Sequence, residues 1–213
     1  MRYLLFLLLP VCVTAQSAPP TLDTAFRFQD GVYLTHQALL NGTPDVPWRE
    51  IAGEMVQLSE DYRLQIEDYG YKKGDYREPY AVVLDGLPYL YVGRDDRRGY
   101  HEFAGLRGLG TYATVRYDTV ETARLLMRAY NPLNGLAFRE GYVWRDRQRT
   151  LDRIVDMRNG RRWPLDQPTV MRLVGDEEDL FAALERSDRA ATDRLLRALA
   201  IYNERHPLRL PYP

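Results

Sequence analysis

The sequence is poor in cysteine: its one cysteine, Cys12, stands near the N-terminus inside an apolar segment. The rest of the chain has no thiol, which excludes a disulfide-rich scaffold, thiol catalysis and cysteine-ligated metal sites there. The chain must therefore gain its stability from a buried core. The roughly 200 residues after this segment suit one domain or two small ones.

An excess of charge of either sign is also missing. The formal net charge is −1 at pH 7, so the chain lacks the strongly basic character by which proteins bind nucleic acids. Histidine is scarce as well, because the three histidines stand apart at positions 36, 101 and 206 and follow no metal-ligand spacing. We expect no nucleic-acid partner and no metal site.

Long hydrophobic runs are absent too. The apolar run from Leu4 to Val13 is shorter than the roughly 20 residues that span a bilayer. It follows a short positive head, and Val13 and Ala15 occupy the −3 and −1 positions of a secretory signal peptide cleaved after Ala15. An uncleaved anchor is the disfavoured alternative, and a lipoprotein is less favoured still because Val11, not a small residue, precedes Cys12.

This segment predicts the domain organisation and the location. We expect a signal peptide over residues 1–15, a flexible proline-bearing leader over residues 16–25, and a single domain over residues 26–213. The chain is expected to be exported to the periplasm or the outer cell surface, with no transmembrane segment after cleavage.

Familiar catalytic and cofactor motifs do not occur. No serine lies in a G-x-S-x-G elbow. The glycines of Gly105–Gly110 are spaced like those of a phosphate loop, but the next residues predict a strand and not a helix, which favours a turn, a bulge or a close crossing of the backbone. Asp95 and Asp96 are adjacent and flanked by arginines, unlike the alternating carboxylates of a calcium loop. We expect no catalytic residue and no cofactor.

The central part of the chain predicts an antiparallel meander. Four β-rich runs follow one another at Tyr80–Leu84, Leu87–Val92, Tyr100–Leu106 and Leu109–Tyr117. Asp85-Gly86 joins the first two, and this dipeptide favours the type I′ turn of a hairpin because both of its residues tolerate positive φ. By the same turn logic, Asn159-Gly160 predicts a second hairpin nearer the C-terminus.

Other segments predict helices. Thr35 can cap a short helix over His36–Leu40, and Asp176 can cap an acidic helix. The last helix is expected from about Ala190 to Glu204 with Leu195, Leu199 and Tyr202 in the core.

Three further segments complete the expected fold. The run Val120–Tyr130 has a helical face, although a strand remains an alternative, Arg145–Arg149 is expected to be a charged loop, and Ile51–Tyr69 fits neither period. These elements predict an α+β fold in which the C-terminal helices pack on an antiparallel sheet.

Both ends of the domain resemble a family. The stretch Asp30-Gly-Val-Tyr-Leu-Thr35 with Leu39-Leu-Asn-Gly-Thr-Pro44, and the tail ending in Tyr202-Asn-Glu-Arg-His-Pro-Leu208, are similar to motifs of uncharacterised exported proteins of Gram-negative bacteria. The resemblance implies export but no known activity, so it assigns no role to any residue.

The candidate binding residues are Tyr89, Tyr91, His101 and Glu102. The two tyrosines share one face of a predicted strand, where aromatic side chains either pack the sheet or bind a sugar or peptide. His101 and Glu102 point to opposite faces and cannot share a site with each other. We expect a non-enzymatic interaction module of the cell envelope that binds an envelope protein or a glycan. The alternative is a hydrolase of an envelope or extracellular polymer with dispersed acid and base residues.

Overall fold

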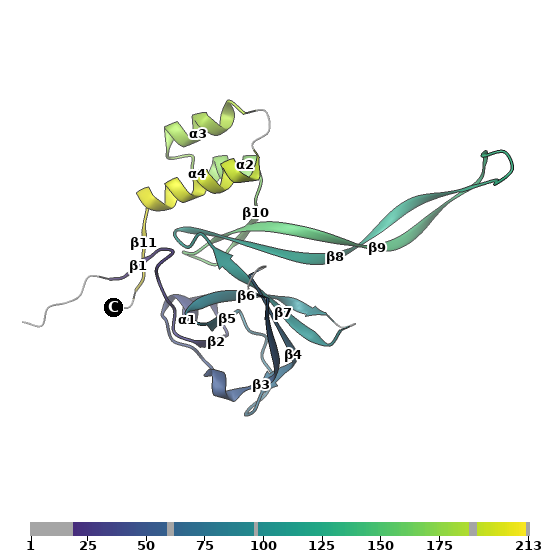
Figure 1. The fold of residues 1–213 in the computed structure, drawn as a ribbon. Helices are drawn as coiled ribbons and strands as arrows, with labels where there is room; N and C mark the ends of the chain where they lie inside the picture. The colour runs from purple at the N-terminus through teal and green to yellow at the C-terminus, as the bar shows by residue number, and fades with distance from the viewer. Residues whose placement is uncertain (1–18, 59–61, 96–97, 188–190, 212–213) are drawn as a thin grey trace, which may run out of the picture.

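The computed structural model describes residues 19–58, 62–95, 98–187 and 191–211, and it shows a β-rich body from which a long two-stranded arm projects (Figure 1). The signal peptide predicted for residues 1–15 lies outside the described residues.

Antiparallel strands make up most of the body. The large sheet contains β2 (Gly31–Tyr33), β3 (Ile51–Leu58), β4 (Arg63–Tyr71), β5 (Ala81–Leu84), β6 (Leu87–Asp95), β7 (Tyr100–Arg107), β8 (Tyr112–Tyr130), β9 (Ala137–Asp156) and β10 (Arg162–Pro164). Its order is β10-β9-β8-β7-β6-β5-β2, with β4 on β7 and β3 on β4. A separate small sheet pairs β1 (Thr21–Leu22) with β11 (Leu208–Arg209).

The predicted meander is present as β5-β6-β7-β8. The turn between β5 and β6 confirms the Asp-Gly prediction, since Asp85 has φ 54° and Gly86 has φ 74°. The second predicted hairpin joins β9 to β10, but there only Gly160 has a positive φ, of 72°, so this turn is not the two-residue type.

The sheet branches at β7. Residues Tyr100–Ala104 of this strand pair with β4, whereas Leu106 and Arg107 pair with β8. Gly105 lies between the two partners, and a Cβ there would stand 3.0 Å from the carbonyl oxygen of Tyr62. The glycine therefore serves a close backbone crossing, which is one of the roles predicted for the stretch Gly105–Gly110.

Both faces of the body strands are buried, because neighbouring residues alternate between two cores. On one side lie Tyr33, Val83, Ala104 and Leu106, and on the other lie Val32, Val82 and Phe103. Helix α1 (His36–Leu40), whose predicted cap is confirmed by a 3.0 Å hydrogen bond from the Ala38 N–H to Thr35 Oγ1, adds Leu39 and Leu40 to the first core. The 3₁₀ turn η1 (Trp48–Glu50) adds Trp48 to the second.

The C-terminal helices form a cluster of their own. Helices α2 (Gln167–Leu173), α3 (Glu178–Glu185) and α4 (Thr192–Arg205) pack together over the start of β8 and the end of β9, where Tyr112 and Ile154 join their core. Leu195, Leu199 and Tyr202 are buried there, as predicted. Asp176 does not cap α3, whose N-cap is Glu177; its carboxylate instead accepts a 3.0 Å hydrogen bond from the Tyr202 hydroxyl.

The predicted α+β class is wrong. The protein is mostly β, with 47% strand and 20% helix, and its helices are few and short beside a large curled antiparallel sheet. The main reason is the segment Val120–Tyr130, which is strand and not helix, together with Arg145–Arg149, which lies inside a strand and not in a loop. The ambiguous Ile51–Tyr69 also contributes most of β3 and β4.

The segment 16–25, predicted as a flexible leader, contains β1. Leu22 is 1% exposed and belongs to the first core. Thr21 and Leu22 pair with Arg209 and Leu208 of β11. Segments from near the two ends of the described chain therefore lie side by side.

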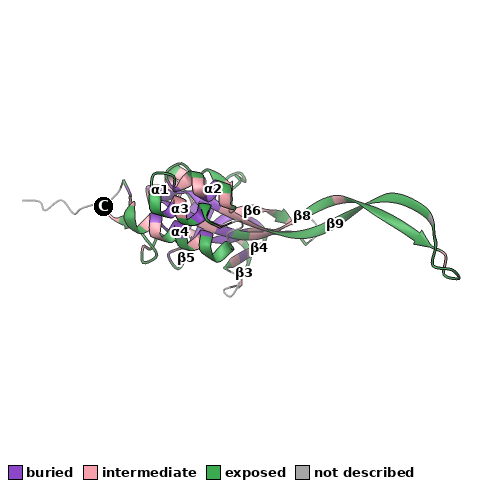
Figure 2. Cartoon of the chain, turned by 90° about the horizontal axis from the view of Figure 1, so that it is seen from above, coloured by how far each residue is buried: buried purple, intermediate pink, exposed green. Residues whose placement is uncertain are grey.

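The arm is formed by β8 and β9 where they leave the body, from Arg116 to Asp152 in the chain (Figure 1). Nearly all of its described side chains are exposed or half-buried (Figure 2). Several of them are large and apolar: Val120, Leu125, Leu126, Met127, Tyr130, Leu133, Leu136, Tyr142, Val143 and Trp144 are between 37% and 94% exposed.

Candidate functional site

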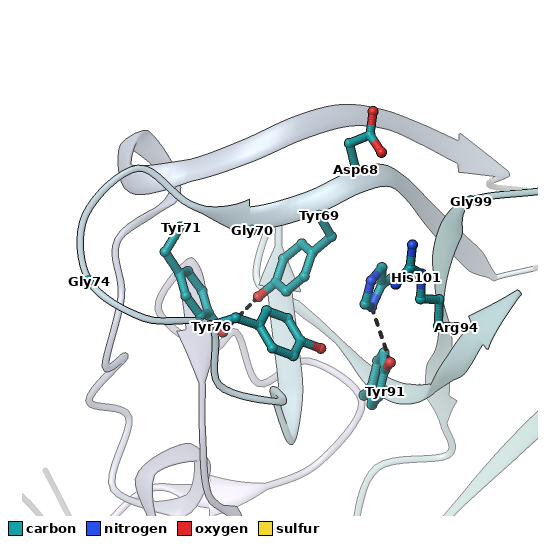
Figure 3. A pocket seen from close by; sticks show the side chains of 10 residues that line it. All are labelled: Asp68, Tyr69, Gly70, Tyr71, Gly74, Tyr76, Tyr91, Arg94, Gly99 and His101. Carbon is teal, nitrogen blue, oxygen red and sulfur yellow. Dashed lines mark hydrogen bonds between the residues drawn. The ribbon is translucent and has the colours of Figure 1, made fainter. Parts of the chain in front are cut away.

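A cavity of about 490 Å³ opens at the end of the body where β4, β6 and β7 meet the loop after β4 (Figure 3). Its wall is rich in tyrosine and glycine, with one carboxylate, one guanidinium and one imidazole: it is lined by Asp68, Tyr69, Gly70, Tyr71, Gly74, Tyr76, Tyr91, Arg94, Gly99 and His101. We call it the tyrosine pocket.

A bulge in β4 aims two tyrosines at the pocket. Leu64 and Ile66 face the core beside Phe103. Asp68 then has φ 48°, and the register passes from Glu54↔Glu67 to Ala52↔Gly70, so two residues of β4 stand opposite one of β3. Such a bulge shifts by one residue the alternation of side chains between the two faces of the strand. Tyr69 and Tyr71 consequently follow Ile66 on the same side of the sheet.

A second bulge, in β6, likewise turns two side chains towards the opposite wall of the pocket. Tyr91 pairs with Phe103, and after the register shift Arg94 pairs with His101. Directly paired residues of antiparallel strands share a face. Tyr91 and Arg94 are three positions apart and would lie on opposite faces of a regular strand, but the bulge brings both to the pocket.

The aromatic rings of the pocket contact one another. The His101 ring lies 5.7 Å from that of Tyr91 in a stacked arrangement, 5.3 Å from that of Tyr69 and 5.8 Å from that of Tyr76. The Tyr91 hydroxyl and His101 Nδ1 are 3.1 Å apart, within hydrogen-bond distance. These contacts hold the wall in place before any ligand arrives.

The hydroxyl groups are ordered as well. The Tyr69 hydroxyl donates to that of Tyr71 at 3.0 Å, and the Tyr71 hydroxyl donates to the Arg77 carbonyl oxygen at 2.8 Å. Burial raises the pKa of Tyr69, Tyr71 and Tyr91 above the ordinary value. All three phenols are therefore neutral at pH 7, and they offer hydrogen bonds and ring faces but no phenolate nucleophile.

Depth differs across the pocket. Tyr69 is 6% exposed and His101 is 7% exposed, so they form the floor, whereas Tyr76, on the loop after β4, is 50% exposed. The rim thus presents an aromatic surface to solvent above a floor of ordered polar groups, the combination by which protein pockets orient small ligands.

The four candidate residues divide into two pairs. Tyr91 and His101 both line the pocket (Figure 3). Tyr89 is on the same side of β6 but is 2% exposed within the core, where its hydroxyl accepts a 3.1 Å hydrogen bond from Gln57 Nε2. Glu102 lies outside the lining.

Glu102 belongs to a charged cluster on the other face of β7. It forms an ion pair with Arg63, whose Nη1 also lies 3.1 Å from Asp118 Oδ2. Burial raises the pKa of Glu102, and the nearby Arg63 opposes that rise. The alternation of β7 thus sends His101 to the pocket and Glu102 to an ion pair.

Tyr69, Tyr71 and Tyr76 line the pocket but were not predicted as binding residues from the sequence. A signal was present, because these tyrosines cluster around Gly70 and Gly74 in a short stretch. Their convergence with Tyr91 depends on the two bulges and on the pairing of β4 with β7, neither of which a single sequence displays.

Among the described residues, no three His, Cys, Asp or Glu side chains gather as a metal-binding group. The three histidines have different partners: His101 lines the pocket, His36 contacts the Tyr80 hydroxyl at 2.9 Å, and His206 contacts Glu177 Oε1 at 2.7 Å.

Comparison of the chain with protein-family models, with curated proteins and with solved structures gives no match. In the described part of the chain, no helix has both the length and the apolar character needed to cross a membrane. Any functional assignment must therefore come from the site itself.

Proposed function

We propose that this chain is an exported cell-envelope protein that binds a saccharide in the tyrosine pocket and does not cleave it. The observation that carries the proposal is a preformed cavity whose wall combines aromatic faces with hydroxyl, imidazole and guanidinium groups. A sugar ring presents an apolar face of C–H groups and an edge of hydroxyl groups, and such a wall complements both.

The exposed ring of Tyr76 supplies the stacking surface. Tyrosine contributes a large apolar area with little loss of side-chain freedom, and it keeps a polar tip for hydrogen bonding. Arg94 borders the same cavity and can bond the hydroxyl edge of a ring, whereas the Asp68 carboxylate points away from the aromatic rings (Figure 3).

The lining favours binding over hydrolysis. Glycoside hydrolases generally use two carboxyl groups about 5–9.5 Å apart on the two sides of the scissile bond. Asp68 is the one carboxylate that lines this pocket, and Glu102 faces the other side of β7 in its ion pair with Arg63. This arrangement lends no support to the alternative of a hydrolase with dispersed acid and base residues.

The test is a thermal-shift measurement of the protein with chitotriose, cellotriose, maltotriose and the peptidoglycan disaccharide as separate probes. A probe present at ten times its dissociation constant stabilises the native state by about 1.4 kcal/mol. For a protein of this size we expect the melting temperature to rise by roughly 3–6 °C.

Two tyrosine variants locate the binding. Tyr76→Ala removes a half-exposed ring at the rim and should abolish the shift without unfolding the protein. Tyr130→Ala removes a ring of similar exposure, 55%, on the arm and should leave the shift intact. Absence of a shift with every probe refutes the proposal, and a shift that survives in Tyr76→Ala places the saccharide elsewhere.

Export is tested separately. Mass spectrometry of the protein recovered from the periplasm of an exporting bacterial host should find an N-terminus at Gln16. Recovery of the chain from the cytoplasm with Met1 still present contradicts this part of the proposal.

A further inference from the structure

The turn at the end of the arm exposes two leucines to solvent. Leu133 is 94% exposed and Leu136 is 67% exposed, and both lie in the segment 131–136 that joins β8 to β9. This turn is the part of the arm that lies farthest from the body (Figure 1). Exposed apolar side chains that gather in one place indicate a surface that binds a partner.

The backbone donors of this turn are satisfied from within it. The N–H of Leu133 donates to Asn131 Oδ1 at 2.9 Å, and the N–H of Leu136 donates to Asn134 Oδ1 at 3.0 Å. The N–H of Gly135 donates to the Asn131 carbonyl oxygen at 2.8 Å, and the N–H of Asn131 donates to the Leu136 carbonyl oxygen at 2.9 Å. The turn can therefore leave water without stranding these donors, as backbone must when it enters an apolar layer.

The arm is basic, whereas the rest of the chain is acidic. Residues 120–149 contain six arginines, no lysine and three acidic residues, which gives a net charge of +3. The whole chain has a formal net charge of −1, so the remaining residues carry −4. An anionic surface would attract the arm and repel the rest of the molecule, and it would therefore orient the molecule with its arm towards that surface.

The length of the arm suits this separation of charge. Residues 120–130 of β8 extend for about 35 Å. Repulsion between exposed charges is largely screened beyond about 8 Å at physiological ionic strength. The acidic body at the far end of the arm is therefore not repelled by a surface that the turn contacts. A small anionic ligand has no extended field from which the body must be kept away, so the length of the arm favours a large anionic surface.

We propose that the turn of the arm, residues 131–136, inserts into the headgroup region of an anionic phospholipid membrane. Leu133 and Leu136 supply the apolar contact with the lipid chains. Tyr130, 55% exposed at the end of β8, has an amphipathic ring of the kind that is enriched at membrane–water interfaces. Arg128 and Arg139, the arginines nearest the turn in the sequence, can contact lipid phosphates.

The combination of groups selects lipid over a soluble polyanion. A soluble polyanion would neutralise the arginines but would leave both leucines in water. The boundary between headgroups and acyl chains takes apolar and cationic side chains together, to a depth of about 5–10 Å. Val120, about 30 Å along β8 from the turn, should remain in water. This membrane contact is independent of the tyrosine pocket.

Co-sedimentation with vesicles tests the membrane contact. The chain used begins at Gln16, so it keeps every described residue and lacks the apolar segment Leu4–Val13, which would itself bind lipid. We expect binding to phosphatidylcholine–phosphatidylglycerol vesicles that is at least about tenfold tighter than binding to pure phosphatidylcholine, because each arginine near an anionic surface strengthens binding several-fold. High salt should weaken the binding to the mixed vesicles.

Serine substitutions locate the contact. Leu133→Ser and Leu136→Ser should each weaken binding to the mixed vesicles by about tenfold, since each removes an apolar side chain from lipid. Val120→Ser is the matched control: Val120 is 62% exposed, close to the 67% of Leu136, but it lies at the body end of the arm and its substitution should leave binding unchanged. All three side chains are exposed, so the variants should keep the melting temperature of the parent chain.

A fluorescent label reports the depth of insertion. The chain from Gln16 onward contains no cysteine, so Leu133→Cys and Val120→Cys each provide a single thiol for an environment-sensitive dye. On addition of the mixed vesicles, the emission of the dye at position 133 should shift to the blue and rise in intensity. The emission of the dye at position 120 should not change.

Four outcomes overturn the proposal. One is the absence of binding to the mixed vesicles, because the partner of the leucines would then be a protein. Another is equal binding to the two kinds of vesicle. The third is binding that Leu133→Ser and Leu136→Ser leave unchanged, because the contact would then be purely electrostatic. The fourth is an equal response of the dye at positions 133 and 120, because the turn would then not lead the insertion.

Discussion

The buried carboxylate of Asp156, at the turn between β9 and β10, makes a quantitative prediction about stability. Its oxygens accept hydrogen bonds from Arg158 Nε and Nη2, both at 2.9 Å, from the Arg158 backbone N–H at 3.0 Å and from Asn159 Nδ2 at 3.1 Å. The Asp156 side chain is 8% exposed, whereas that of Arg158 is 48% exposed.

Asp156→Asn replaces the two guanidinium bonds by at most one and faces an amide N–H₂ towards a cation. A hydrogen bond to a charged group contributes about 1.5–3 kcal/mol when buried. Because Arg158 is half exposed, solvent weakens its share. We expect a loss of about 2–3 kcal/mol at pH 7, seen in urea denaturation and as a fall of roughly 4–12 °C in melting temperature.

The same substitution at Asp152 is the control. Asp152 also accepts two bonds from one arginine, Arg116, at 2.6 and 3.2 Å. The Arg116 and Asp152 side chains are 49% and 31% exposed, so this pair stands in solvent. Asp152→Asn should cost less than about 1 kcal/mol. Equal losses for the two variants would refute the argument from burial.

The loss at Asp156 should depend on pH. Burial tends to raise the pKa of Asp156, but the hydrogen bonds from Arg158 outweigh it and hold the pKa below the ordinary range. The stability from a carboxylate of this kind is complete above the unfolded pKa of about 3.9 and is lost as pH falls through the folded pKa. The difference between the wild type and Asp156→Asn should be constant from neutral pH to about pH 5 and should shrink below pH 4. A stability difference between the two proteins that stays constant down to pH 3.5 would contradict the role assigned to the Asp156 carboxylate.

Three further substitutions and one control, each followed by urea denaturation, test contacts and caps of the helices. Gly110→Ala should cost about 2–3 kcal/mol, since the added Cβ would lie 2.4 Å from Cγ of Asn203, the residue that joins α4 to β8. The control Gly141→Ala, with no atom within 4 Å of the added Cβ, should be nearly neutral. Similar losses of stability at the two sites would show that the contact with Asn203 does not matter. Leu199→Ala, at a site 2% exposed, should cost about 2–5 kcal/mol, and a loss under about 1 kcal/mol would mean that the helical cluster is loosely packed. Thr35→Ala should cost about 1 kcal/mol through loss of the N-cap bond of α1, and an unchanged stability would contradict that role.

The elements that the sequence predicted well carry their own local signal. The turn at Asp85-Gly86 needs two positive φ values, the cap at Thr35 needs one hydroxyl, and the apolar stripe of α4 needs one buried face. In each case the residues that fix the structure are within a few positions of one another.

The arm could not be predicted in this way. Alternation of apolar and polar residues appears where a strand has one buried face. Both faces of the arm are largely exposed, so no core imposes a period of two on Val120–Tyr130, and apolar residues there recur at the three- and four-residue spacing of a helix. Its partner strand, β9, is dense in arginine and therefore has the composition of a loop.

Only part of the tyrosine pocket could be predicted from the sequence. Tyr91 and His101 were selected because they lie on strands and combine aromatic and polar character. The bulges at Asp68 and after Tyr91 were not visible, and they decide which neighbouring side chains reach the cavity. Glu102 shows the converse, because alternation alone excluded it from a site shared with His101.

The pairing of β1 with β11 has a consequence for the time order of folding. Leu22 of β1, 1% exposed in the first core, is among the earliest described residues to be synthesised. Its partner strand, β11, contains Leu208, from near the other end of the described chain. Contacts of such long sequence separation form late, since the loop between them must close first. The body therefore cannot complete its core until almost the whole described chain is present, and a nascent chain that still lacked β11 would leave β1 unpaired.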